Sequence, residues 1–167
     1  MSTTDPRELL LYELGITRDA ERTGRILVRR IRDQVRNETL VETLRRVEQQ
    51  SEEHLANVNT CFEALGATAL DTPSDLINGL SARFDEFTHL RPSTELVEMF
   101  GLMTVRQFLG IGITDARGLI DWALLLGETR CAQCLRTSLA EKEETLRELE
   151  RIGTELSQRI IASVPAS

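Results

Sequence analysis

The fold is decided by the stretch Leu139-Ala-Glu-Lys-Glu-Glu-Thr-Leu-Arg-Glu-Leu-Glu-Arg-Ile-Gly153. Leucine and isoleucine recur in it at steps of three and four residues, which places their side chains on one face of an α-helix. The apolar face extends on both sides of the stretch and comprises Leu135, Leu139, Leu146, Leu149, Ile152 and Leu156. Lys142 falls within this face. A lysine in such a position must extend to solvent or find a partner inside the protein.

Two earlier segments with helical periodicity also carry a polar residue within an apolar face. Glu21 interrupts the first, which starts at Pro6 and ends or pauses near Asn37, and His54 interrupts the second, which ends before Gly66. We expect Glu21, His54 and Lys142 to form a polar cluster inside the protein. The cluster is either a structural contact or the remnant of a single-metal site that recruits Glu52 or Glu144.

Length and composition limit the class of protein. A chain of 167 residues suits one domain, and its 41% hydrophobic and 4% aromatic residues, dominated by Leu, Glu and Arg, favour helices. The net charge of −7 argues against binding to nucleic acid or anionic membranes. No signal peptide is visible, and the most apolar run, Leu119–Leu126, is too short to span a membrane. We therefore expect a cytoplasmic protein.

The order of the segments predicts an all-α fold. The short connection near Asn37 makes the first two helices an antiparallel hairpin, and residues 67–92 form a long crossover with a short helix starting at Thr72-Pro73-Ser74-Asp75. A third long helix runs from Pro92 to Gly127, and the last from Glu128 to about Ile161. We predict a four-helix bundle over residues 6–162 with tails at 1–5 and 163–167. Gly110 and Gly112, inside the third helix, indicate close helix approach, a kink or a bulge.

Four short motifs, in order and spacing, resemble those of the YciF-like ferritin-like proteins, bacterial helical bundles associated with stress responses. They are Asp19-Ala-Glu21, Glu52-Glu-His54, Cys61-Phe-Glu-Ala-Leu-Gly66 and Glu141-Lys-Glu-Glu144. The resemblance covers about Leu10 to Ile160 and implies a ferritin-like fold with metal ligands on facing helices. In ferritin-like proteins that bind two metal ions, these ligands are glutamates and Glu-x-x-His pairs.

The sequence departs from that ligand pattern in three helices. Ser51, not a glutamate, precedes His54 by three residues; the third helix reads Leu109-Gly-Ile-Gly112; and Lys142 stands where a glutamate is expected. We therefore predict a stress-associated protein that has lost its di-metal site, with no catalytic residue and no cofactor. It would act as a homodimer or through an unknown protein partner. Surplus apolar residues of the third helix suggest the dimer face: Met99, Phe100, Met103, Phe108, Trp122, Leu124 and Leu125.

Two alternatives stay open at this point. The first is a metal-dependent oxidase, peroxidase or iron-binding protein that holds iron or manganese through Glu21, Glu52, His54, Glu141 and Glu144. The second is a thiol-based sensor, since Cys131 and Cys134 form a Cys-x-x-Cys motif near a helix start, where the helix dipole lowers a thiol pKa. An isolated Cys-x-x-Cys motif is better explained by two small side chains facing the bundle.

Overall fold

The computed structural model describes residues 4–165, and within this range the chain forms five α-helices and no strand. They are α1 (Pro6–Arg32), α2 (Glu38–Ala64), α3 (Asp75–His89), α4 (Thr94–Leu125) and α5 (Thr129–Ala162). The predicted all-helical bundle is confirmed. Residues 1–3 and 166–167 of the expected tails lie outside the described residues.

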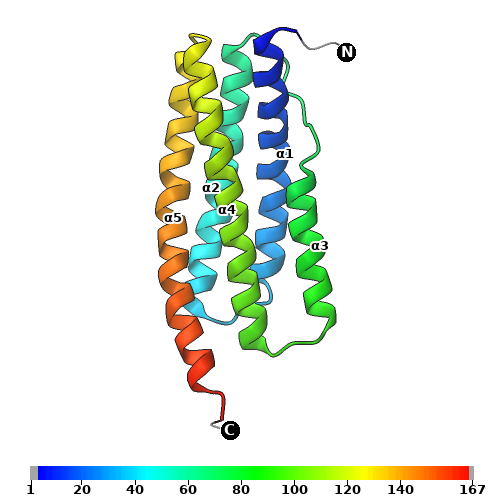
Figure 1. Ribbon diagram of the computed structural model, residues 1–167, viewed down its shortest axis with the longest axis vertical. Coiled ribbons are helices and arrows are strands. Elements are labelled where there is room, and N and C mark those ends of the chain that lie inside the picture. Colours follow the sequence, from blue (N-terminus) through cyan, green and yellow to red (C-terminus); the bar gives the residue numbers. More distant parts are fainter. Residues whose placement is uncertain (1–3, 166–167) are drawn as a thin grey trace.

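The four long helices form a bundle, and α3 lies on its outside (Figure 1). Helices α1 and α2 make one antiparallel hairpin and α4 and α5 make another, while the crossover returns the chain along the length of the bundle through α3. Each long helix packs against two others in the ring α1–α2–α5–α4. Helices α1 and α5 are therefore diagonal neighbours, and only their inward side chains can meet.

The helix ends follow from local sequence signals. The side chains of Asp5, Asn37 and Ser93 accept hydrogen bonds from the first-turn backbone N–H groups of α1, α2 and α4. Gly66 and Gly127, directly after the ends of α2 and α4, have φ angles of 65° and 76°. Glycine is favoured there because it adopts this left-handed conformation without steric cost.

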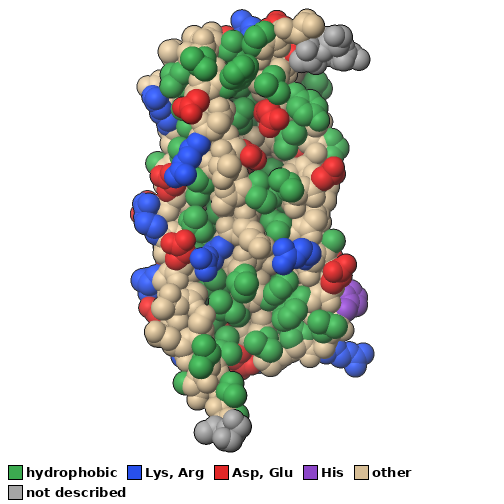
Figure 2. Space-filling model, in the orientation of Figure 1, with side chains coloured by type: hydrophobic (Ala, Val, Ile, Leu, Met, Phe, Trp, Pro, Cys, Tyr) green, Lys and Arg blue, Asp and Glu red, His purple; other side chains and the backbone are tan. Residues whose placement is uncertain are grey.

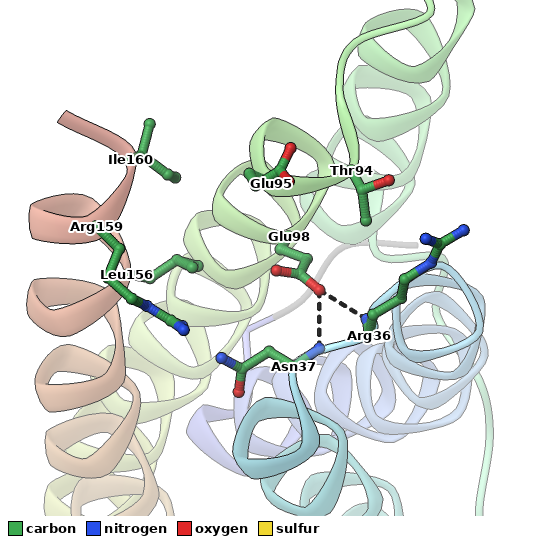
Figure 3. A pocket seen from close by; sticks show the side chains of 8 residues that line it. All are labelled: Arg36, Asn37, Thr94, Glu95, Glu98, Leu156, Arg159 and Ile160. Carbon is green, nitrogen blue, oxygen red and sulfur yellow. Dashed lines mark hydrogen bonds between the residues drawn. The ribbon is translucent and has the colours of Figure 1, made fainter. Parts of the chain in front are cut away.

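The turn between α1 and α2 is fixed by a carboxylate from α4. Glu98 is buried, and its Oε1 accepts hydrogen bonds from the backbone N–H groups of Arg36 at 2.7 Å and Asn37 at 2.8 Å (Figure 3). The same residues line a surface pocket of about 340 Å³ at this end of the bundle. Glu98 thus satisfies two backbone donors of the turn and ties the first hairpin to the second.

The interior consists of two apolar clusters. One includes α3 and is centred on Leu27, Val28, Leu44, Phe84, Leu102 and Leu149. The other lies toward the start of α5 and includes Leu10, Leu14, Val58, Phe62, Ile120 and Leu135. All four long helices contribute to both clusters. Between the two apolar clusters, the residues at inward positions are Glu21 in α1, His54 in α2, Gly112 in α4 and Lys142 in α5.

The expectation that the apolar residues of α4 are left over for a dimer face is wrong for Phe100 and Phe108. Phe108 is buried and fills the space over Gly24, where an added Cβ would lie 2.2 Å from its ring. Phe100 stacks on Phe87 of α3 with ring centroids 4.1 Å apart, so the crossover helix covers it. Met103, Leu124 and Leu125 are exposed, and Figure 2 shows hydrophobic side chains spread between charged ones over this face.

Helix α4 is also long and apolar enough to cross a membrane by length and composition, with a window whose mean hydropathy is 1.4. This window is longer than the run Leu119–Leu126, on which the sequence argument relied. Half of the window is buried inside the bundle. A core helix packed between α1 and α5 meets the same test.

Candidate functional site

Lys142 is the centre of the candidate site. Its ammonium group donates hydrogen bonds to Oε1 of Glu21 and to Nδ1 of His54, the latter at 2.8 Å. The side chains of Glu21, His54 and Lys142 are each at most 5% exposed. The structure therefore brings together, from α1, α2 and α5, the three residues that interrupt the apolar faces. We call these residues and Glu141 the core polar cluster.

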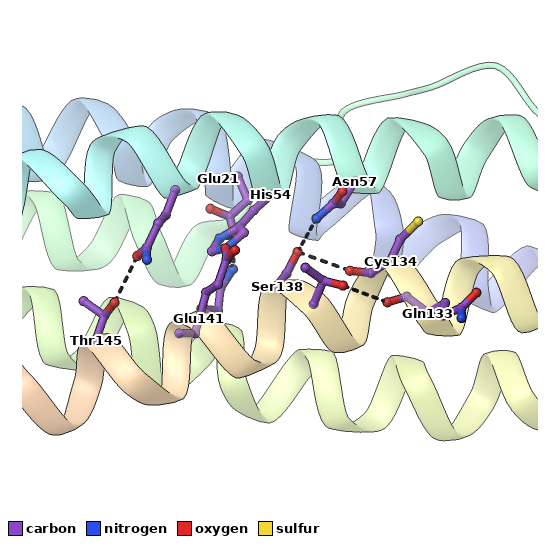
Figure 4. Close-up of polar contacts among 11 residues, drawn as sticks. Glu21, His54, Asn57, Gln133, Cys134, Ser138, Glu141 and Thr145 are labelled. Carbon is purple, nitrogen blue, oxygen red and sulfur yellow. Dashed lines mark hydrogen bonds and ion pairs between the residues drawn. The ribbon is translucent and has the colours of Figure 1, made fainter.

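Glu141 completes the cluster from its solvent side. Its Oε2 lies 2.8 Å from Nε2 of His54, and its side chain is one third exposed (Figure 4). Because the Lys142 ammonium has no lone pair, Nδ1 of His54 must accept, which assigns the ring proton to Nε2. Nε2 then donates to Glu141. Glu141, His54, Lys142 and Glu21 thus form one continuous chain of hydrogen bonds.

The core polar cluster lowers the pKa of the Glu21 carboxyl group. Burial raises the pKa of this carboxyl group, but its interactions with the Lys142 charge and with His54 outweigh burial, and the pKa falls from 4.5 to about 2. Glu21 is therefore a carboxylate at neutral pH, paired with a cation. Its second oxygen, Oε2, is buried and has no hydrogen-bond partner in the protein.

Gly112 makes room for the lysine. A Cβ atom built at this position would lie 2.7 Å from Cε of Lys142. A larger residue here would require the end of the Lys142 side chain, which pairs with Glu21 and His54, to shift. Gly110, two residues earlier, has no neighbour within 4 Å of a built Cβ. Helix α4 is continuous through both glycines, so close approach, not a helix break, explains Gly112.

The core polar cluster belongs to a longer polar contact between α2 and α5. One turn away on one side, Nδ2 of Asn57 donates to Oγ of Ser138 at 3.0 Å. On the other side, the hydroxyl of Thr145 donates to Oε1 of Gln50 at 3.0 Å. Figure 4 shows these contacts as successive steps along the two helices. They fix the register of α5 against α2 and so the height at which Lys142 enters the core.

Two residues proposed as metal ligands lie away from the cluster. Glu52 pairs with Arg25 at 2.6 Å, with more than half of its side chain exposed. Glu144 is exposed on the outer side of α5. Among residues 4–165, no group of three or more histidine, cysteine, aspartate or glutamate side chains is arranged to hold a metal ion. Glu21, His54 and Glu141 do lie close together, but the Lys142 ammonium lies between Glu21 and His54.

The two cysteines of the Cys-x-x-Cys motif lie in the first two turns of α5, far along the helix from Lys142. Cys131 is fully buried, Cys134 is half-buried, and both are free thiols. Cys61, near the end of α2, contacts Cys131. The sequence alone does not predict this contact, since no periodicity relates residues 61 and 131.

Sequence reasoning missed several residues that shape the site. For Gly112 the sequence left close helix approach, a kink and a bulge open, and did not indicate that the missing side chain admits Lys142. Ser138 and Thr145 flank Lys142 at one-turn spacing and gave a usable signal, because small polar residues recurred on the inner face of a long helix.

Comparison with known proteins decides the family. The sequence profile described as domain of unknown function DUF892 matches residues 5–162. The chain belongs to the DUF892 family. The expected relationship to YciF-like proteins is confirmed, since this DUF892 chain is similar in structure to the stress protein YciF of E. coli. A search of curated protein sequences gave no match.

Three solved structures are similar in fold to this DUF892 chain. YciF of E. coli has a TM-score of 0.87 and 15% identity, with 93% of this chain and 99% of that chain covered. YcfI of Rhodopseudomonas palustris, provisionally described as a structural protein, has a TM-score of 0.85 and 20% identity, covering 90% and 98%. A protein of Xanthomonas campestris pv. campestris has a TM-score of 0.74 and 18% identity, covering 93% and 98%. At these identities the likeness concerns the fold.

Proposed function

We propose that this protein is a metal-free, non-catalytic, ferritin-like member of its family, in which Lys142 replaces the cationic charge of a di-metal centre. It would serve in bacterial stress physiology, in the cytoplasm, through self-association or a protein partner. The observation that carries the proposal is the position of the Lys142 ammonium between the Glu21 carboxylate and the His54 ring.

The donor set does not fit a pair of iron or manganese ions. Such a pair requires several carboxylates and imidazoles from facing helices. Here the inward positions offer one carboxylate from α1, one histidine from α2, a glycine from α4 and a lysine from α5, with Glu141 at the edge. An ammonium donates hydrogen bonds and repels a metal cation at the same place. The same groups are joined to one another by hydrogen bonds, with only Oε2 of Glu21 left without a partner in the protein, and these mutual contacts support a structural role.

Stress association rests on the relatives. YciF of E. coli is described as a stress protein, and YcfI is provisionally described as a structural protein. A structural role suits a bundle in which the buried Lys142 and Glu21 pair with each other within one chain of hydrogen bonds.

Self-association would use the exposed apolar residues where α1 begins and α4 ends, which lie at the same end of the bundle (Figure 1). These exposed residues are Leu9 and Tyr12 in α1 and Leu124 and Leu125 in α4. We propose that a second copy of the chain covers them. Light scattering is expected to show a dimer at high micromolar concentration and a monomer for Leu125→Glu. A wild-type protein that stays monomeric at that concentration would remove this part of the proposal.

Metal content tests the central claim. Wild-type protein and Lys142→Glu are produced in medium supplemented with iron and manganese, and the purified proteins are subjected to elemental analysis. We expect well below one metal ion per wild-type chain and a higher content in Lys142→Glu, which places a carboxylate between Glu21 and His54.

Two further variants identify the ligands if the wild type does carry metal. Stoichiometric iron or manganese that disappears in Glu21→Ala would overturn the proposal. Loss of that metal in Glu144→Ala, a change on the exposed side of α5, would instead favour the oxidase or peroxidase alternative with its wider ligand set.

A further inference from the structure

The three cysteines of the chain gather at the end of the bundle where α2 stops and α5 starts. Cys61 lies in the last turn of α2, Cys131 in the first turn of α5, and Cys134 one turn further. Cys61 and Cys131 are fully buried in the second apolar cluster, whereas Cys134 is half-buried. All three are free thiols. None of them takes part in the core polar cluster.

Cys61 and Cys131 are in direct contact. Sγ of Cys61 lies 3.6 Å from the carbonyl oxygen of Cys131, although the two residues are 70 positions apart in the chain. The contact between the two residues raises the pKa of the Cys61 thiol and lowers the pKa of Cys131, with burial and the charge of Glu128 opposing the second effect. The N-terminus of α5 also favours a thiolate at Cys131. The Cys131 thiol therefore ionises more readily than the Cys61 thiol.

Cys134 connects this buried pair to the surface. Residues three apart on a helix are neighbours, so Cys131 and Cys134 lie within the range of Cα separations that a disulfide bridges. Cys134 is the most exposed of the three thiols. A reagent in solution therefore meets Cys134 first and the buried Cys61–Cys131 pair only through it.

We propose that Cys61, Cys131 and Cys134 form a dithiol–disulfide site, in which Cys134 reacts with a small disulfide from solution and the end product is a Cys61–Cys131 disulfide that links α2 to α5. The packing role of three small side chains explains their burial alone. It does not explain why a partly exposed thiol stands one turn from a buried pair whose members touch.

The chemistry balances as three exchanges. The Cys134 thiolate attacks one sulfur of the small disulfide RSSR, whose sulfur–sulfur bond breaks and releases RS⁻. The Cys131 thiolate attacks the Cys134 sulfur, releases the second RS⁻ and forms a Cys131–Cys134 bond. Cys61 gives its proton to a released thiolate and attacks the Cys131 sulfur, which returns Cys134 as a thiolate. One RSSR is reduced to two thiols, and two protein thiols are oxidised.

Peptide mapping of the natively folded protein tests the proposal with oxidised glutathione as the probe. After exposure, free thiols are alkylated and the protein is digested with trypsin without reduction. Cleavage at arginine leaves Cys61 in residues 47–83 and the other two cysteines in residues 131–136. We expect these two peptides to be joined, with the alkyl group on Cys134. A glutathione adduct on Cys134 with Cys61 and Cys131 both alkylated would overturn the proposal, as would a cross-link that forms only in denaturant.

Three serine variants separate the steps. Cys134→Ser is expected to slow the cross-link by about tenfold or more, because the entry thiol is gone. Cys61→Ser should stop at a Cys131–Cys134 disulfide, and Cys131→Ser should keep a stable glutathione adduct on Cys134. Oxidation of Cys134→Ser at the wild-type rate would refute the entry role of Cys134. If a variant does not fold, the wild-type map decides alone, and no outcome depends on whether the protein binds metal.

Discussion

Removing the Glu21 carboxylate is the sharpest perturbation of the core polar cluster. In Glu21→Ala, the Lys142 ammonium keeps its burial but loses its anionic partner, and His54 remains as its only neighbour in the chain of hydrogen bonds. Stranding one charge of a buried pair costs about 3–5 kcal/mol. The variant should therefore lose a large part of the stability of a domain of this size.

The structure gives an independent magnitude. The pKa of Glu21 falls from 4.5 to about 2 because the interactions of its carboxylate with Lys142 and His54 outweigh burial. That difference corresponds to about 3 kcal/mol of net stabilisation of the charged form. This value is of the same order as the cost of stranding one charge of a buried pair.

Urea unfolding followed by far-ultraviolet circular dichroism measures the effect. Glu52→Ala is the matched control, because Glu52 forms an ion pair of the same type with Arg25 on the surface and should cost less than about 1 kcal/mol. The double variant Glu21→Ala/Lys142→Met removes both charges, and we expect it to be more stable than the sum of the single changes predicts, by about 2–3 kcal/mol. Wild-type-like unfolding of Glu21→Ala, or strict additivity in the double variant, would refute the pairing.

Three further outcomes follow from the same contacts. Because the pKa of Glu21 is lowered in the folded state, its stabilisation is present above pH 4.5 and is lost as the pH falls toward about 2, so the stability gap between wild type and Glu21→Ala in urea titrations should narrow over this window. Gly112→Ala displaces Lys142, whereas the Cβ of Gly110→Ala meets open space. The free energy of unfolding of Gly112→Ala should therefore be lower than that of Gly110→Ala by about 2 kcal/mol or more, with a lower urea midpoint. Equal midpoints would contradict a close fit of Lys142 against Gly112. Glu98→Ala leaves the backbone N–H groups of Arg36 and Asn37 without their acceptor and should cost about 1–3 kcal/mol in the same assay, with faster amide exchange at these two residues; unchanged exchange would argue against the contact.

The faces of the helices show why only part of the site was predictable. Side chains two residues apart on a helix are rotated by about 200° around the helix axis, so they point to nearly opposite sides. Glu52 and Glu144 are each two positions from an inward residue, His54 and Lys142, and the structure accordingly places both outside. Glu141 is adjacent to Lys142, at the edge of the inward face, and reaches His54 from there. Periodicity alone could have excluded the first two, but it could not decide whether an edge residue finds a partner.

The surface formed by the apolar residues of α4 was likewise only partly predictable from the sequence. Met99 to Leu125 contains more apolar side chains than one inward face needs, and the sequence therefore suggested an interface. Phe100 is covered by α3 through Phe87, and Phe108 fills the space above Gly24. The crossover helix absorbs part of the surplus, and its position against α4 depends on contacts between residues distant in the chain.

The sequence by itself determined the helices, their ends and the three polar interruptions, because periodicity, capping residues and terminal glycines act within a few residues. Only the tertiary structure decided that Glu21, His54 and Lys142 meet. Their meeting requires that α1 and α5, diagonal in the bundle, present these side chains at one height, and that Gly112 leaves the space between them open. Heights and spaces of this kind are set by the packing of all four helices, and local sequence patterns carry no information about them.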